Sequence, residues 1–270
     1  MKIQSTTRPA FFLVGKMSTK DVIFVLVPGS FATTIMYDKV TTILEKAGYT
    51  VKPVELLSAN DGSRLPAPQM TDDAAEIRSA ILSILESGKN VVLALQSYAG
   101  FPGSEACKGL SQTDRGEGNT AVIGIVYAAS FLPEQGKSLR DTMDAYMPEF
   151  YKAGIPGGYF PPVPPEMAGA VFNDITDQDE VLKYGKAMTG HSSDTYSGKL
   201  SYTAWKDIPG TTIIPGQDQI VATVEQENQY EHVVKSGGKI KRVFVEGGGH
   251  GITVTQPQLV VDELIALAKA

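Results

Sequence analysis

The stretch NVVLALQSYAG, residues 90–100, joins a continuous apolar run to a serine that is followed by small residues. Residues 91–95 are typical of a strand buried on both faces of a parallel sheet. Ser97 follows this strand, and Ala99 and Gly100 leave room for a sharp turn into a helix. Such a turn pushes the serine hydroxyl out of the sheet, beside backbone N–H groups. The stretch therefore predicts a nucleophile at Ser97, with an ordinary turn residue as the alternative.

Strand-like and helical patterns alternate on both sides of this stretch. Further strands are expected at residues 22–27, 51–57, 121–129, 211–214 and 240–245. An Asp73–Glu76 capping pair predicts the start of one helix, and Pro257 the start of the last. The helix after Ser97 should reach about residue 110, with a distortion at Pro102. Strands that alternate with helices predict an α/β fold with a doubly wound, mostly parallel sheet.

The alternation fails between residues 131 and 205, where Pro-rich clusters separate short helical pieces. A chain of 270 residues is long enough for one large domain. We expect a single domain over residues 21–270 with a cap inserted at about 131–205. Residues 1–20 carry basic side chains without acidic ones, and are expected to form an N-terminal extension, with a first strand or a targeting segment as the alternatives.

Composition narrows the classes of partner. A net charge of −6 and a pI of about 5.2 disfavour nucleic acid and anionic membranes. No run approaches the roughly 18 apolar residues that a membrane span needs. The single cysteine, Cys107, excludes an internal disulfide and fits a reducing compartment, so a cytoplasmic location is expected. A small-molecule substrate is the expected partner, and the oligomeric state stays open.

A base and an acid for Ser97 can be sought among residues that follow later strands. The sequence has three histidines. His250 follows the strand at 240–245 and stands among glycines that allow its loop to bring the imidazole over the sheet. His232 lies inside a helix, and His191 lies in the cap, where it could touch substrate. We therefore expect His250 to be the base that accepts the serine proton.

Asp218 is the expected acid, because it directly follows the strand at 211–214 and lies between Ser97 and His250 in the chain. Asp207 precedes that strand and is a weaker alternative. The remaining competitors lie in the cap: Asp174, Asp177 and Asp179. A lone aspartate in a loop is usually a turn or cap residue. The assignment of Asp218 therefore depends on its position between Ser97 and His250 in the chain.

The oxyanion of an acyl-transfer reaction needs two N–H donors. One is expected from Tyr98, which follows Ser97, and the other from Ser30 or its neighbour Phe31. Gly29 would allow substrate to approach the backbone closely. In the cap, we expect Met147, Phe150, Tyr159 and Phe160 to contact substrate, unless they form the cap's own core. No metal site is predicted.

Four motifs carry a family resemblance: VLVPGSF (25–31), LQSYAGFPGSEA (95–106), PGQDQIV (215–221) and EGGGHGI (246–252). The sequence resembles the α/β-hydrolase superfamily, and in particular the branch of plant methylesterases, hydroxynitrile lyases and related small fungal hydrolases. The resemblance implies catalytic roles for Ser97, Asp218 and His250. Three positions depart from the family pattern: Pro28 replaces a usual His, Leu95 replaces a small residue and should crowd the turn, and Gln96 replaces a residue that is often His or Glu.

We expect a cofactor-independent serine hydrolase that cleaves an ester, thioester or lactone of a mostly apolar small molecule through an acyl-enzyme. One alternative is a lyase or another carbon–carbon-bond-cleaving enzyme on the same scaffold. The resemblance implies that a lyase would carry Thr and Lys where this chain has Val25 and Gly251. The other alternative is a non-catalytic small-molecule receptor, since the superfamily includes hormone receptors that keep the triad.

Overall fold

The computed structural model describes residues 21–270, so the expected N-terminal extension lies outside the described residues. A six-stranded sheet in the order β2-β1-β4-β5-β8-β9 forms its centre, and every neighbouring pair is parallel. The strands are β1 (Val22–Val27), β2 (Thr50–Pro53), β4 (Asn90–Gln96), β5 (Val122–Ala128), β8 (Gly210–Pro215) and β9 (Ile240–Val245). The predicted doubly wound parallel sheet is thereby confirmed.

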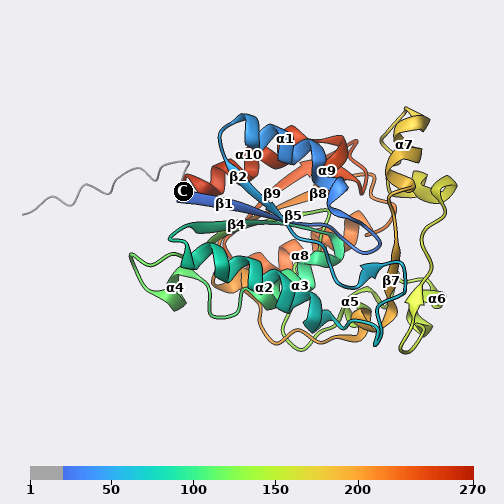
Figure 1. Ribbon diagram of the computed structural model, residues 1–270, viewed down its shortest axis with the longest axis horizontal. Coiled ribbons are helices and arrows are strands. Elements are labelled where there is room, and N and C mark those ends of the chain that lie inside the picture. The colour runs from blue at the N-terminus through green and yellow to red at the C-terminus, as the bar shows by residue number, and fades with distance from the viewer. Residues whose placement is uncertain (1–20) are drawn as a thin grey trace, which may run out of the picture.

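Helices cover both faces of the sheet (Figure 1). On one face lie α1 (Asp38–Lys46) and α10 (Pro257–Ala268), and on the other lie α2 (Met70–Glu86), α3 (Gly100–Ala106) and α8 (Thr223–Lys235). The side chains of β1 and β4 pack against both layers, which explains why their sequences are apolar without alternation. The order of the strands reverses between β1 and β4. The loops that follow these two strands therefore border the crevice in which doubly wound sheets bind ligands.

The boundaries differ from the sequence-based expectation in a few places. Helix α2 begins at Met70, where Asp72 accepts a hydrogen bond from the N–H of Gln69 at 2.7 Å, so Asp73 does not cap it. Helix α3 contains Pro102 in its first turn, where a missing N–H costs no intrahelical hydrogen bond, so the expected distortion does not occur. Strand β2 ends at Pro53 instead of continuing to residue 57. A short helix, α9 (Ile252–Thr255), was not expected.

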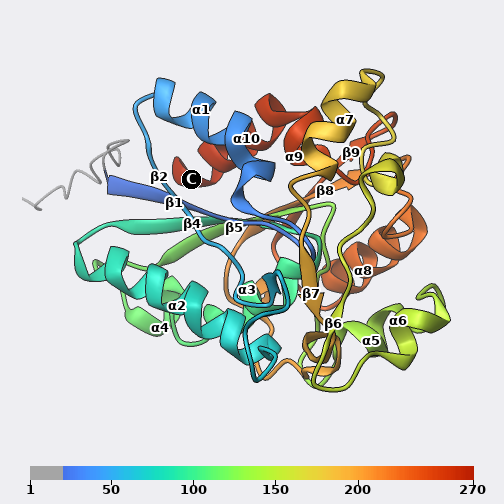
Figure 2. The same cartoon turned by 45° about the vertical axis from the view of Figure 1, so that its right-hand side comes forward.

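Residues 131–205, which we call the insertion, join β5 to β8 at the carboxyl end of the sheet (Figure 2). Two short strands, β6 (Tyr159–Phe160) and β7 (Gly190–Ser192), pair antiparallel with each other, and β7 also pairs with β3 (Ala59–Asn60). The rest consists of short helices: α5 (Leu139–Met143), α6 (Glu149–Ala153), η4 (Pro165–Ala170), α7 (Gln178–Gly185), η5 (Ser193–Ser197) and η6 (Ala204–Lys206). The small sheet ties the insertion to the loop that precedes α2. The remaining short elements are η2 (Thr34–Tyr37), η3 (Ser97–Ala99) and α4 (Gln112–Arg115).

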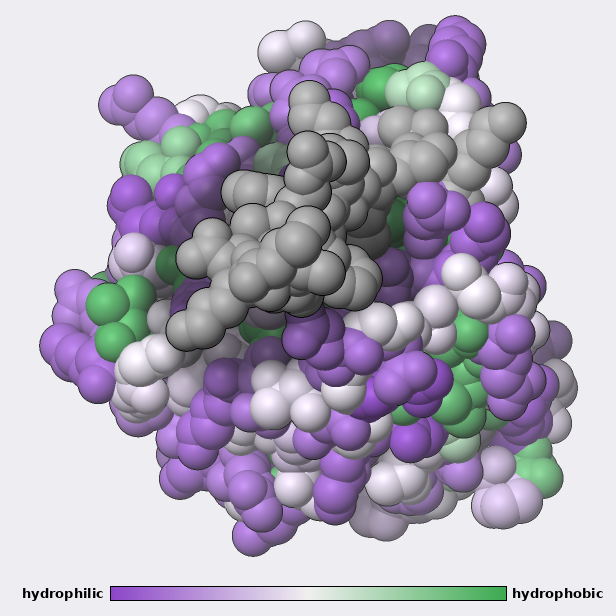
Figure 3. Space-filling model, turned by 90° about the vertical axis from the view of Figure 1, so that its left-hand side faces the viewer, coloured by the Kyte–Doolittle hydropathy of each residue, from purple (hydrophilic) through white to green (hydrophobic). Residues whose placement is uncertain are grey.

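The opposite end of the sheet, where the parallel strands begin, carries mainly hydrophilic residues on the part of its surface that residues 21–270 display (Figure 3). Within the same residues, no helix is both long enough and apolar enough to cross a bilayer. The crevice in which doubly wound sheets bind ligands lies at the other end of the strands, beneath the insertion.

Candidate active site

Ser97 lies immediately after β4, in a backbone conformation that side chains rarely adopt, with φ at 52°. Such a conformation is strained for a residue with a Cβ and persists only where the surroundings hold it. Two contacts hold it here. The Ser130 hydroxyl donates a hydrogen bond to the Ser97 carbonyl at 2.7 Å. Gly100 packs so closely on the chain after β5 that a Cβ there would lie 2.5 Å from the Phe131 carbonyl oxygen.

The crowding expected from Leu95 is relieved by helix α3. Leu95 is completely buried, and a Cβ on Gly103 would lie 2.4 Å from its Cδ2 atom. The bulk that the family pattern avoids on the strand is thus accommodated by a glycine on the facing helix. A second close approach lies on the other side of the serine, where a Cβ on Gly29 would be 2.8 Å from the Ser97 Cβ. Gly103 makes room for Leu95 and Gly29 makes room for Ser97 itself, so the turn can stay sharp.

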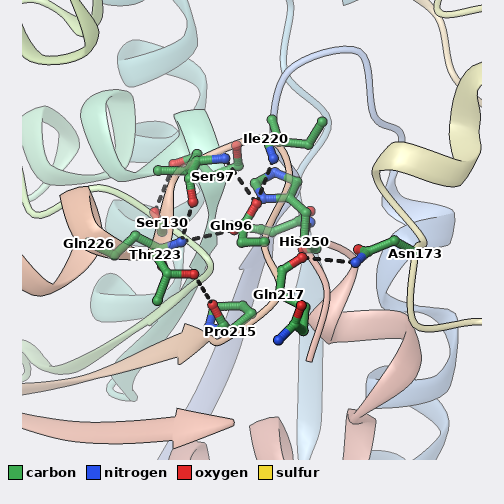
Figure 4. A network of polar contacts seen from close by, with 12 residues as sticks. Gln96, Ser97, Ser130, Asn173, Pro215, Gln217, Ile220, Thr223, Gln226 and His250 are labelled. Atoms are coloured by element: carbon green, nitrogen blue, oxygen red, sulfur yellow. Dashed lines mark hydrogen bonds and ion pairs between the residues drawn. The ribbon is translucent and has the colours of Figure 1, made fainter. Parts of the chain in front are cut away.

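Asp218 and His250 meet at the ends of β8 and β9. The imidazole Nδ1 of His250 is 2.9 Å from Oδ2 of Asp218, and the two side chains are almost entirely buried. The carboxylate also accepts hydrogen bonds from the N–H groups of Ile220 and Val221 at 2.8 and 2.9 Å, and from Gln226 at 2.9 Å (Figure 4). A carboxylate held in this way can fix the orientation of the ring, and it leaves the second nitrogen, Nε2, available to accept a proton.

The loop that carries His250 uses its glycines for close packing. None of the glycines from Gly247 to Gly251 has a positive φ, so the conformational freedom expected of them is not what the loop requires. A Cβ on Gly249 would lie 2.3 Å from Oδ1 of Asn173, and one on Gly251 would lie 2.4 Å from Cδ1 of Phe172. The loop passes directly under the insertion, and any side chain at these two positions would collide with it.

Ser97 and His250 line one cavity of about 260 Å³. No Asp, Glu, Lys or Arg side chain is among the residues that line it. Within residues 21–270 the Ser97 hydroxyl forms no hydrogen bond with the imidazole, a contact that commonly tightens only when substrate is bound. The candidate oxyanion residues Ser30, Phe31 and Tyr98 line the same cavity, as does Gly29. The cavity can therefore hold a neutral molecule against the serine.

The insertion supplies the roof of the cavity, but through only part of the expected set. Met147 lines the cavity, whereas Phe150, Tyr159 and Phe160 do not. Phe150 is 53% exposed, and Phe160 is fully buried beneath it, where it packs against Phe31, Tyr151 and Tyr196. Tyr159 donates a hydrogen bond to the carbonyl of Arg64 at 2.6 Å. In this structure these three side chains pack the insertion against itself and against neighbouring loops instead of lining the cavity, so their contact with substrate stays a prediction.

Several polar residues near the site could not be identified from the sequence. Gln226, which orients Asp218, lies inside helix α8 without any distinguishing pattern. Asp73 and His191 are fully buried beside the oxyanion residues. The only sequence signal for Asp73 indicated a helix cap, and His191 was noted only as a cap residue that could touch substrate. Among residues 21–270, no group of three or more His, Cys, Asp or Glu side chains is arranged to hold a metal ion.

The sequence model of the α/β hydrolase family matches residues 24–263, and the chain belongs to this family. "Probable hydrolase R7" of Phoma sp. is 26% identical over 243 residues, covering 90% of this chain and 96% of that protein. The α/β hydrolase nvfD of Aspergillus novofumigatus is 28% identical over 238 residues, covering 88% and 92%. Among solved structures, polyneuridine aldehyde esterase superposes with a TM-score of 0.70 at 20% identity, covering 92% of this chain and 100% of its own. The likeness to that esterase concerns the fold.

Proposed function

We propose that this α/β hydrolase is a cofactor-independent serine hydrolase that cleaves an ester, thioester or lactone of a neutral, mostly apolar small molecule. One observation carries the proposal. A strained serine at the end of β4 opens into the same cavity as a histidine whose other nitrogen is held by a buried carboxylate. This combination supplies a nucleophile, a base and an orienting acid, which are the groups that acyl transfer through serine needs.

The proposed reaction has two halves. Ser97 Oγ forms a bond to the substrate carbonyl carbon while its proton moves to Nε2 of His250. The negative charge on the carbonyl oxygen is held by the N–H of Tyr98 and that of Ser30 or Phe31. Collapse breaks the bond to the leaving alkoxide or thiolate, which takes the proton from His250. Water then adds to the acyl-enzyme in the same way and releases the acid and the free serine.

The cavity supports a substrate without charge. Its walls present aromatic, methionine and aliphatic side chains, with hydroxyl and amide groups but no ionised side chain. A carboxylate or phosphate that enters such a site loses its hydration without gaining a counter-ion, which is strongly unfavourable. The volume of about 260 Å³ fits a small organic molecule better than a polymer.

Hydrolysis is favoured over the lyase alternative by the surroundings of Gly251. In the hydroxynitrile lyases that the motifs resemble, a Lys follows the catalytic His and would stabilise the departing cyanide. Here a Cβ at position 251 would collide with the buried ring of Phe172, so a side chain there would require that ring to move. Val25, which stands where those lyases have Thr, is fully buried within β1 and cannot reach substrate.

The proposal predicts that a fluorophosphonate probe labels Ser97 and that the protein turns over p-nitrophenyl esters or lactones. Ser97→Ala should lose labelling and lower turnover on the order of 10⁴-fold or more, while thermal unfolding stays close to that of the parent. Aldehyde release from cyanohydrins, measured beside ester hydrolysis, tests the lyase. Turnover by Ser97→Ala within about tenfold of the parent would refute the nucleophile, and labelling without turnover would favour a receptor.

A further inference from the structure

A second buried polar cluster lies behind the serine, between the sheet and the insertion. His191 of β7 is fully buried at its centre. Its Nε2 atom is 3.1 Å from the hydroxyl of Thr195 and 3.4 Å from that of Ser30. Its Nδ1 atom is 3.5 Å from the hydroxyl of Ser58. The imidazole therefore joins the loop before α2 to the loop after β1, which carries an oxyanion donor.

Asp73 of α2 anchors the other side of the cluster. Its carboxylate accepts hydrogen bonds from the N–H of Ser58 at 3.0 Å and from the Ser58 hydroxyl at 2.6 Å. It also accepts one from the phenol of Tyr98 at 2.9 Å. Tyr98 follows the nucleophile and is the other expected oxyanion donor. The side chains of both donor residues, Ser30 and Tyr98, are thus attached to one hydrogen-bonded chain.

Aromatic packing closes the cluster. The His191 ring lies 5.0 Å from that of Tyr98, 5.3 Å from that of Phe31 and 5.5 Å from that of Tyr196. The Tyr196 phenol donates a hydrogen bond to the Ser30 hydroxyl at 3.0 Å. Burial lowers the pKa of the His191 imidazole to about 3, so the ring stays neutral at ordinary pH. Neither its burial nor its charge state suits proton transfer, whereas both suit a fixed spacer.

The cluster also carries a cost that a purely structural role would not require. Burial raises the pKa of the Asp73 carboxyl to about 6, because the charged form is poorly solvated there. A buried carboxylate is rarely a net source of stability, and apolar packing commonly replaces such groups without loss. Residues kept at the expense of stability beside a reactive serine are those expected to serve function.

Building on the serine hydrolase proposed above, we infer that Asp73 and His191 are positioning residues for its oxyanion hole. The two N–H donors belong to separate loops, after β1 and after β4, and their spacing must hold to about 0.5 Å for full effect. The cluster fixes that spacing through Ser30 and Tyr98. The oxyanion forms only as the reaction proceeds and is absent from bound substrate. Loss of the donor spacing should therefore lower kcat and leave KM nearly unchanged.

The test compares Asp73→Asn, His191→Gln and Tyr98→Phe with the parent. Each keeps the backbone N–H donors and removes one link of the cluster. We expect kcat to fall roughly 10- to 100-fold, less than the loss typical of deleting a donor outright, with KM within about threefold. Affinity for a trifluoromethyl ketone, whose adduct with Ser97 carries an oxyanion, should fall in parallel. The double variant Asp73→Asn/His191→Gln should lose little more than the worse single variant.

A matched control is Glu263→Gln in α10, which changes another buried carboxylate, one that contacts Thr211 and Lys241. It should leave kcat and the ketone affinity unchanged even if it alters stability. Tyr98→Phe keeps the test valid if Asp73→Asn does not fold. Equal kcat and ketone affinity in variants and parent, or a rise in KM alone, would overturn the positioning role while Ser97 labelling persists. Failure of the parent to label at Ser97 would instead overturn the proposed hydrolase and this role with it.

Discussion

Two histidines lie within the protein near the same serine, and their surroundings differ in every respect that matters for proton transfer. His250 borders the cavity, and its ring is oriented by the carboxylate of Asp218 at 2.9 Å. His191 is fully buried among aromatic rings, and hydroxyl groups are its nearest polar partners. Burial opposes a charged imidazole at His191, whereas His250 faces a carboxylate. The neighbours of a histidine, more than its distance from the nucleophile, indicate whether it can act as a base.

The largest expected effect comes from exchanging the two histidines for glutamine in turn. His250→Gln should lower ester turnover roughly 10⁴-fold or more, because within residues 21–270 no other His and no Asp, Glu or Lys side chain lines the cavity to take the Ser97 proton. His191→Gln should cost no more than about 100-fold, since the base is intact and only the oxyanion donors are disturbed. Steady-state kinetics on one p-nitrophenyl ester would measure both.

A second readout sharpens this comparison. His191→Gln should keep the parental dependence of kcat/KM on pH, because it leaves His250 and the carboxylate that orients it in place. Comparable losses in the two variants, or a changed profile in His191→Gln, would mean that the assignment of roles is wrong.

The difference between the two clusters also explains what the sequence could and could not reveal. Ser97, Asp218 and His250 each follow a strand of a parallel sheet, and such positions converge at one edge whatever the details of packing. Their placement could therefore be expected from strand order alone. The link between Asp73, Ser58 and His191 depends on how α2, its preceding loop and β7 pack together. Residues 15 and 133 positions apart in the chain form it, and no periodic pattern connects them.

The sequence indicated where the insertion interrupts the alternation of strands and helices, but not how the side chains inside the insertion are oriented. Its helices are short: α6, for example, has five residues, which is too few for an apolar face to stand out. Met147 and Phe150 are both large and apolar and lie three residues apart, yet one faces the cavity and the other faces solvent. Similarly, the sequence indicated crowding at Leu95 but not that Gly103 would relieve it.

Lowering the pH should change the stability of the fold in opposite directions through His191 and Asp73, the two titratable members of the buried cluster. The His191 pKa, about 3, lies below the ordinary value of 6.5, so its stabilising contribution is complete above pH 6.5 and is lost as the pH falls toward 3. The Asp73 pKa, about 6, lies above the ordinary 3.8, so its contribution is present below pH 3.8 and is lost as the pH rises through 6. Acidification from pH 7 to pH 4 should therefore weaken the fold through His191 and strengthen it through Asp73.

Thermal unfolding between pH 7 and pH 4 measures this opposition. His191→Gln should lose less Tm on acidification than the parent, and Asp73→Asn should lose more, with differences on the order of 5 °C. Glu263→Gln serves again as the buried control outside the cluster. If the plots of Tm against pH ran parallel for the parent and all the variants, neither His191 nor Asp73 would have the shifted pKa that its burial implies.

The smallest expected effect concerns the roof of the cavity, where Met147 and Phe150 form a natural pair. Met147→Ala should enlarge the acyl or alcohol pocket and shift kcat/KM between short and long esters by about 1–3 kcal/mol, the usual value of one apolar contact. Phe150→Ala removes a larger side chain, but one that is 53% exposed on the outer surface, so the preference should stay that of the parent. A panel of p-nitrophenyl esters of increasing chain length measures both variants under one set of conditions. If Phe150→Ala changed the preference as much as Met147→Ala did, the insertion would have to rearrange around substrate, bringing its outer face into the site.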